Sequence, residues 1–211
     1  MRDKYQEELE QLNASIIKMG KMIEIAIESS IIALMGRDVE AAKTVSINDD
    51  QIDSMERDIE AQCMKILLQQ QPVASDLRIV TSALKMVTDM ERIGDHAADI
   101  ADLVIQIPDC KYNKLNTITE MSTQIINMLH QSILSYTEKD FNKAQNVIVL
   151  DDVIDELYHE IKKDLIEKIK QTEDGEQILD YLLIAKYFER IGDHATNIAE
   201  WVIFALTGKK K

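Results

Sequence analysis

The sequence predicts an all-α protein built from two pseudo-symmetric, antiparallel three-helix bundles. Its composition is typical of long helices, because leucine, isoleucine, alanine, methionine, glutamate, lysine and glutamine are abundant, while the 211 residues include only six glycines and two prolines. Apolar residues recur at steps of three and four. The stretch 90–105 returns at 188–203 with eleven of sixteen positions identical, which indicates two copies of one unit.

Each copy is expected to hold three helices. Neighbouring helices should be antiparallel, because the turns between them are short. Pro72 is expected at the first position of the third helix, where its missing N–H costs nothing. The first bundle should cover 1–108 and the second 109–211, lying end to end or side by side. The expected helices span about 5–34, 39–70, 72–107, 115–136, 141–170 and 176–206.

The charge and the cysteines narrow the class of protein. A formal net charge of −14 argues against nucleic-acid binding, which needs lysine and arginine to neutralise phosphates, and favours cations or a basic protein partner. The first ten residues lack the apolar segment of a secretion signal, and no apolar run is long enough to span a membrane. Cys63 and Cys110 are unrelated in position, which indicates free thiols in a reducing cytoplasm, with Cys63 in the core.

Acidic residues follow one side of the repeated helix. In the first copy they are spaced by four, four and three residues, which keeps them within about 80° around the helix. Carboxylates one turn apart repel each other, so an ordinary solvated surface would mix them with lysines. Arg92 and Arg190 are expected to point away from this stripe, and the stripe itself to face outward. Its members are Glu91, Asp95, Asp99 and Asp102, and in the second copy Glu189, Asp193, Asn197 and Glu200.

The preceding helix of each copy carries matching acids. An antiparallel hairpin about Pro72 places Asp53 level with Glu91, since each lies nineteen residues from the turn, and Asp49 near Asp95. Oxygen-rich clusters of this kind suit hard or borderline cations, among them Mg²⁺, Ca²⁺, manganese, iron and zinc. The predicted metal-binding residues are Asp49, Asp53, Glu91, Asp95, Asp99, Asp151, Asp155, Glu189, Asp193 and Asn197.

Several alternatives stay open for these residues. The acids could form only a solvated surface. His96 and His194 lie about 100° round the helix from the stripe, so hydrogen bonding between helices is the leading interpretation and metal ligation a second one. Gly94 and Gly192 are expected to allow close helix approach. A buried di-iron site is disfavoured because the Glu-x-x-His pairs are missing. No nucleophile constellation or phosphate loop is present, so we do not expect an enzyme.

The paired motifs resemble the PhoU family of bacterial phosphate-signalling regulators. The likeness rests on E-R-I-G-D-H-A at 91–97 and 189–195, on D-D-x-I-D at 49–53 and 151–155, and on Q-P-V-A-S-D-L-R at 71–78. The resemblance implies two three-helix bundles that bind multinuclear metal clusters through Glu-x-x-x-Asp motifs, with iron, zinc or manganese as the metal. Asn197 departs from this pattern, since the first copy has Asp99 there.

The resemblance also implies a function. Such proteins are cytoplasmic, commonly form homodimers, and act as negative regulators of the phosphate-starvation response. They couple the ATPase subunit of the Pst phosphate transporter to the sensor histidine kinase PhoR, so they meet the membrane only through partners. The alternative is a helical bundle that stores metal or hydrolyses phosphate esters with metal, and a third possibility is a purely structural bundle.

Overall fold

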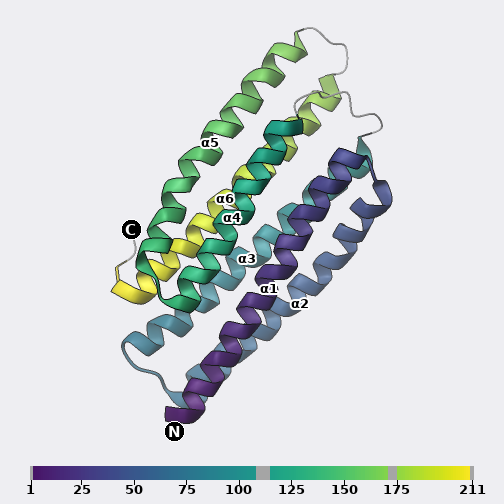
Figure 1. The fold of residues 1–211 in the computed structure, drawn as a ribbon. Coiled ribbons are helices and arrows are strands. Elements are labelled where there is room, and N and C mark those ends of the chain that lie inside the picture. Colours follow the sequence, from purple (N-terminus) through teal and green to yellow (C-terminus); the bar gives the residue numbers. More distant parts are fainter. Residues whose placement is uncertain (1, 108–114, 171–174, 210–211) are drawn as a thin grey trace.

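The computed structural model describes residues 2–107, 115–170 and 175–209, and over these ranges all regular secondary structure is helical. The first three helices pack on one another as an antiparallel bundle, and so do the last three (Figure 1). The helices are α1 (Arg2–Gly36), α2 (Val39–Gln70), α3 (Ser75–Gln106), α4 (Leu115–Glu138), α5 (Phe141–Ile169) and α6 (Gly175–Thr207).

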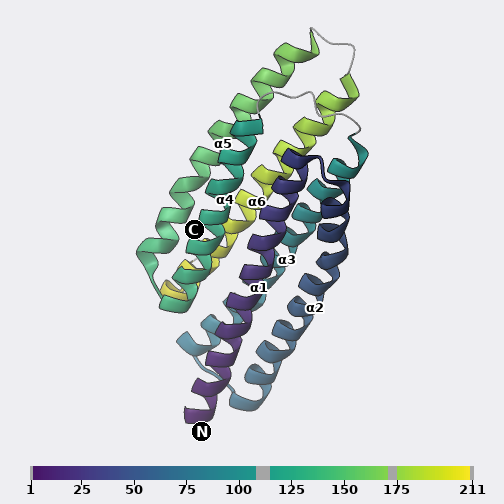
Figure 2. The ribbon, with the colours of Figure 1, turned by 45° about the vertical axis from the view of Figure 1, so that its right-hand side comes forward.

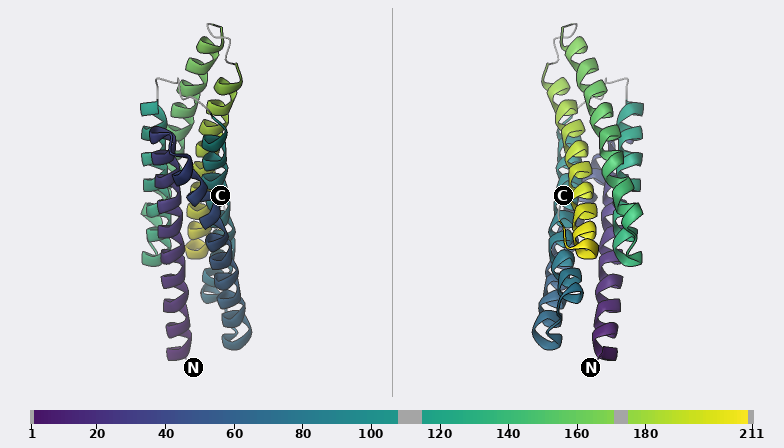
Figure 3. Two further views of the ribbon diagram at one scale, coloured as in Figure 1. Left: turned by 90° about the vertical axis from the view of Figure 1, so that its right-hand side faces the viewer. Right: turned by 90° about the vertical axis from the view of Figure 1, so that its left-hand side faces the viewer.

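The two bundles lie side by side, which is one of the two arrangements that the sequence left open. α3 packs along α6 in the opposite direction, and α1 packs beside α4 (Figures 1 and 2). The start of α1 and the α2–α3 hairpin project at one end of the molecule, while α5 and α6 project at the other (Figure 3). The copies are therefore related by a pseudo-two-fold axis across the α3–α6 contact, and their apolar faces merge into one core.

Helical periodicity explains the core of each bundle. In α1 the fully buried side chains follow steps of three and four, so they share one face, which packs against α2, α3 and α4. Each large apolar side chain among them contributes about 1.5 to 3 kcal/mol by leaving water. These large residues are Leu12, Ile16, Met19, Ile23 and Ile27.

The turn between the first two helices is the same in both copies, 102 residues apart. Asp38 caps α2 by accepting hydrogen bonds from two backbone N–H groups, and Asp140 caps α5 in the same way. The preceding residues, Arg37 and Lys139, have left-handed φ values of 54° and 57°. A shared turn gives both copies the same angle of entry into the acid-bearing helices.

The start of α3 differs from the expectation. The helix begins at Ser75 rather than at Pro72. Proline disfavours helical backbone in the residue before it, and Gln71 instead adopts the left-handed conformation with φ 48°. Ala74 also has a positive φ, of 50°, but its ψ of −115° lies outside that conformation. Four non-helical residues therefore reverse the chain between α2 and α3.

Some expectations concern other parts of the chain. Cys63 is fully buried in the core, as predicted, and forms no disulfide. Cys110 and the boundary at 108/109 lie outside the described residues. Within the described residues, no helix combines the length and apolar character needed to cross a membrane.

Candidate metal site

The α2–α3 hairpin brings acids from two helices together in the first bundle. One carboxylate oxygen from each of Asp49, Asp53 and Asp95 lies within 4.8 Å of the other two. Glu91 is close enough for its charge to interact with those of Asp95 and Asp53. These four residues, called the first acidic cluster below, stand at the heights that the sequence predicted from the hairpin.

Gly94 makes this close approach possible. A Cβ atom at this position would lie 3.0 Å from Ile52 Cγ2 and 3.2 Å from Asp49 Oδ1, so these two side chains of α2 would have to give way by a few tenths of an ångström. In the second bundle a Cβ atom on Gly192 would lie 3.2 Å from Ile154 Cγ2. Both glycines therefore have the packing role that the sequence predicted.

The first acidic cluster is electrostatically crowded. Burial, followed by the charges of Asp95 and Asp53, raises the pKa of Asp49 to about 6. Burial and Asp95 likewise raise the pKa of Glu91 to about 7. The Asp49 Oδ1 atom is buried and has no hydrogen-bond partner. A cation would relieve both the repulsion and this unsatisfied oxygen.

Arg92 was expected to point away from the acidic stripe, and this expectation is wrong. Its Nη1 lies 2.7 Å from Asp95 Oδ2, and its Nε lies 3.5 Å from Glu91 Oε2. Residues three apart on a helix are neighbours, so a long arginine side chain reaches back to the stripe. The stripe is also not fully outward, because α2 covers part of it and only 16% of the Glu91 side chain is exposed.

The second acidic cluster consists of Asp151, Asp155, Glu189 and Asp193. Burial, followed by the charges of Glu189 and Asp151, raises the pKa of Asp193 to about 6, and Lys186 opposes this rise. The Lys186 ammonium binds both carboxylate oxygens of Glu189. Among the described residues, the grouping of three ligand atoms within 4.8 Å is found in the first cluster.

Two predicted ligands make other polar contacts in the structure. Asn197 Nδ2 donates a hydrogen bond to Asp89 Oδ1 at 3.2 Å, so the structure does not bring it to the second cluster. Asp99 Oδ2 lies 3.2 Å from His96 Nδ1, although its charge still raises the pKa of Asp49. Burial is the main cause that lowers the pKa of His96.

Two residues on the acid-bearing helices differ between the copies, and the sequence did not lead us to predict their roles. Lys186 stands where the first copy has Thr88, and Asp89 stands where the second has Tyr187. Comparison of the repeats at an offset of 98 could have found both. Glu56, one turn beyond Asp53, had no repeat signal, yet burial followed by the charges of Glu60 and Asp53 raises its pKa.

The residues of the first cluster fit a cation. Three carboxylates converge, and an unpartnered buried oxygen is available among them. Carboxylate oxygens suit hard cations such as Mg²⁺, Mn²⁺ and iron. The second cluster fits less well, since a cation would have to compete with the Lys186 ammonium for Glu189.

The fold and the site together define a class of protein, a duplicated helical bundle with one acidic cluster on the second and third helices of each copy. The PhoU domain family matches residues 16–104 and again 118–202, and the chain therefore belongs to the PhoU family. The match covers both acid-bearing hairpins.

Relatives match the chain over nearly its whole length. A phosphate-specific transport system accessory protein PhoU homolog from Clostridium acetobutylicum is 35% identical over 98% of this chain and 95% of its own. A homolog from Aquifex aeolicus is 35% identical over 87% of this chain and 84% of its own.

Two crystal structures share the fold. PhoU from Pseudomonas aeruginosa superposes with a TM-score of 0.91 at 32% identity, covering 97% of this chain and 100% of that one. The phosphate transport system regulatory protein PhoU from Streptococcus pneumoniae gives a TM-score of 0.92 at 28% identity, covering 98% and 99%. The side-by-side bundles thus match experimentally determined structures.

Proposed function

We propose that this protein is an accessory regulator of a phosphate transport system. The observation that carries the proposal is the match along both copies to relatives that bear this description. In the finer form of the proposal, the protein works in the cytoplasm as an adaptor. When phosphate is plentiful it joins the transporter's ATPase subunit to the sensor histidine kinase PhoR and so holds back the phosphate-starvation response.

The acidic clusters are proposed to be cation sites within this adaptor. Asp49, Asp53, Asp95 and Glu91 would hold the metal in the first bundle, with iron, zinc and manganese as the expected ions. A bound cation would neutralise the repelling carboxylates and stiffen the α2–α3 hairpin. The neutralised hairpin would present a different charge to a partner, which is how a cation could change affinity for one.

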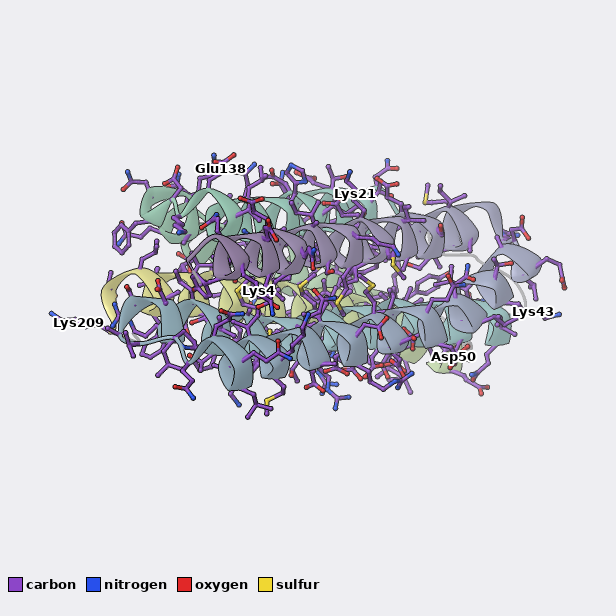
Figure 4. The ribbon with its side chains drawn as sticks, turned by 90° about the horizontal axis from the view of Figure 1, so that it is seen from below. Lys4, Lys21, Lys43, Asp50, Glu138 and Lys209 are labelled. Carbon is purple, nitrogen blue, oxygen red and sulfur yellow. The ribbon has the colours of Figure 1, made fainter. Side chains whose placement is uncertain are left out.

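Elemental analysis of protein purified without affinity tags or chelators tests the cation sites. The variant Asp49→Asn with Asp95→Asn removes two acids of the first cluster, and Asp151→Asn with Asp193→Asn does so in the second. We expect bound metal to fall by at least about tenfold at the altered cluster. The matched control is Asp50→Asn with Asp152→Asn, two exposed neighbours of which Asp50 lies on the outer surface of α2 (Figure 4). Equal metal in all three variants would refute the sites.

Reciprocal capture with purified partners tests the adaptor role. The transporter ATPase subunit and the cytoplasmic part of the kinase are each immobilised and exposed to the full-length protein. We expect both to retain it, and a bridged complex to form when the two partners are mixed with it. Failure of the ATPase subunit to retain the wild-type protein in either direction would count against the adaptor.

A phosphatase assay separates the adaptor from the metal-dependent hydrolase. The proposed regulator produces no turnover of p-nitrophenyl phosphate with added Mn²⁺ or Fe²⁺. Turnover that Glu91→Gln and Glu189→Gln abolish would favour the hydrolase instead.

Light scattering after size exclusion tests the proposed homodimer, for which a mass of about twice 24.1 kDa is expected.

A further inference from the structure

The first bundle has an apolar groove between α1 and α2 that adjoins the first acidic cluster, since Asp49 lines it. The groove encloses about 350 Å³, and Gly94 of α3 forms part of its floor. Its walls are mostly apolar or small, so neither helix fills the space between them. The principal wall residues are Met22, Ile25, Ala26, Ser29, Ala41 and Ile52.

The second bundle carries a larger side chain at the matching position. At an offset of 102, Ala26 corresponds to Met128, which is fully buried. The apolar residues at the mouth are replaced as well, since Ile25 corresponds to Asn127. Met22 and Ala41 likewise correspond to Gln124 and Lys143. The residues that line the groove therefore differ between two otherwise matching copies.

An apolar stripe extends from the groove along the outer side of α1. Ile25 and Ile32 are seven residues apart, hence on one face of the helix, and they are 61% and 65% exposed. Water-exposed isoleucines beside a hollow are the pattern of a helix-binding surface, where a partner helix supplies apolar residues at matching steps.

The charge around the groove selects its occupant. Asp49, whose carboxylate carries the unpartnered oxygen, forms one wall, and Asp50 and Asp53 follow on α2. The whole chain carries a formal charge of −14, so its surface favours a basic partner. A lysine or arginine side chain can lay its aliphatic stem on the apolar wall and bring its charge to the carboxylates.

We propose that this groove is the docking site for a basic amphipathic helix of the protein's regulatory partner. The helix places its apolar residues in the groove and on the Ile25–Ile32 stripe, and directs its lysines or arginines to the acids of α2. The inference rests on the proposed function, because it assigns a surface and a partner chemistry to the adaptor.

Fluorescence anisotropy with labelled model peptides tests the docking site on the full-length protein. The probe is the amphipathic peptide LKKLLKLLKKLLKL, and its twin LEELLELLEELLEL keeps the apolar face but reverses the charge. We expect the lysine peptide to bind and the glutamate peptide to bind at least about tenfold more weakly. Equal binding of the two peptides would refute the proposed charge selection.

Substitutions taken from the second bundle test the location. Ala26→Met fills the groove without changing the charge, and we expect it to raise the Kd of the lysine peptide at least about tenfold, the effect of one lost apolar contact. Ile25→Asn at the exposed mouth of the groove should weaken binding of the lysine peptide similarly. Because Ile25 is exposed, this change leaves the packing of the core unaltered. Ile166→Asn makes the same change at an exposed residue of α5 and should leave the Kd unchanged. Unchanged binding by both groove variants would overturn the proposal.

The same variants separate this inference from the function on which it rests. If Ala26→Met and Ile25→Asn bind the peptide and capture the ATPase subunit as the wild type does, the groove is wrong and the adaptor stands. If the wild type fails to capture that subunit while peptide binding still depends on the groove, the proposed partner is wrong and the docking site stands.

Discussion

His194 of α6 and Asp89 of α3 join the two bundles, with the imidazole Nδ1 2.8 Å from the carboxylate Oδ1. The same oxygen accepts a hydrogen bond from Asn197 at 3.2 Å. Only 15% of the Asp89 side chain and 23% of the His194 side chain are exposed. On the pseudo-symmetric side, Tyr187 replaces Asp89 and lies against His96, with ring centroids 5.4 Å apart. The contact between bundles is therefore polar on one side and aromatic on the other.

Replacing Asp89 should weaken this contact. The variant Asp89→Ala leaves His194 and Asn197 without their shared acceptor in a half-buried position, so we expect the free energy of unfolding to fall by about 2 kcal/mol. Urea unfolding measures the change. Asp58→Ala, on the exposed side of α2, is the control and should change stability by less than about 0.5 kcal/mol. A double-mutant cycle with His194→Ala should return a coupling energy of about 1 kcal/mol. A coupling energy of zero would show that the Asp89–His194 contact does not contribute to stability.

Gly94→Ala should destabilise the protein even though alanine favours helices. The gain in helix propensity is about 1 kcal/mol. The added Cβ would lie 3.0 Å from Ile52 Cγ2, so this side chain would have to shift within a tight contact, at a cost of about 1 to 3 kcal/mol. We expect a net loss of about 1 kcal/mol in thermal or urea unfolding. Gly36→Ala, with nothing within 4 Å, should instead be neutral or slightly stabilising, and the same sign for both variants would argue against close packing at Gly94.

Helical periodicity made most of the fold and part of the site predictable. The rise per residue in a helix is fixed, so counting nineteen residues from the turn placed Asp53 beside α3 even though α3 begins three residues later than expected. The close approach at Gly94 was predicted because a glycine inside a helix lets a neighbouring helix pack closely. The bundles' side-by-side arrangement was left open, because apolar faces of this kind can pack at an end or along a side.

Other features depend on side-chain choices that periodicity does not fix. The direction of Arg92 is set by which rotamer reaches a carboxylate, and Lys186 likewise reaches Glu189 within its own helix. The turn of Asn197 toward Asp89 depends on the contact between bundles, which has no trace in the spacing of one helix. The small Ala26 lines the α1–α2 groove, and its counterpart at an offset of 102 is the larger, buried Met128, a difference that helical spacing alone does not reveal.

The stability of the metal-free protein should fall as the pH rises from 5 to 8. The pKa of Asp49 is raised to about 6 and that of Glu91 to about 7, mainly by burial. An acid whose pKa is higher in the folded state binds more protons there, so it stabilises the fold at low pH and loses this effect as the pH passes the folded pKa. We expect the loss to be about 2 kcal/mol, after allowance for partial solvation and coupling between the two acids.

Urea unfolding in the presence of a chelator at several pH values measures this slope. The comparison is the difference between the wild type and the variant Asp49→Asn with Glu91→Gln, because the histidines titrate in both proteins and cancel. The variant should be more stable than the wild type at pH 8, and the difference should shrink toward pH 5. A difference that does not change with pH would show that these acids titrate normally in the folded protein.

Lys186→Thr should make the second bundle a better cation site. Thr88 occupies the corresponding position in the first bundle, and the Lys186 ammonium neutralises Glu189 in the second. Removing it restores the negative charge of the cluster, whose Asp193 then loses the influence that opposes its raised pKa. If metal binds as proposed, we expect the Kd for Mn²⁺ at the second cluster to fall about tenfold, as measured by calorimetry in a background of Asp49→Asn and Asp95→Asn.

Lys163→Thr, an exposed lysine on α5, removes the same charge without touching Glu189 and should leave the Kd unchanged. Equal effects of the two substitutions would mean that overall charge, and not the Lys186–Glu189 pair, limits binding.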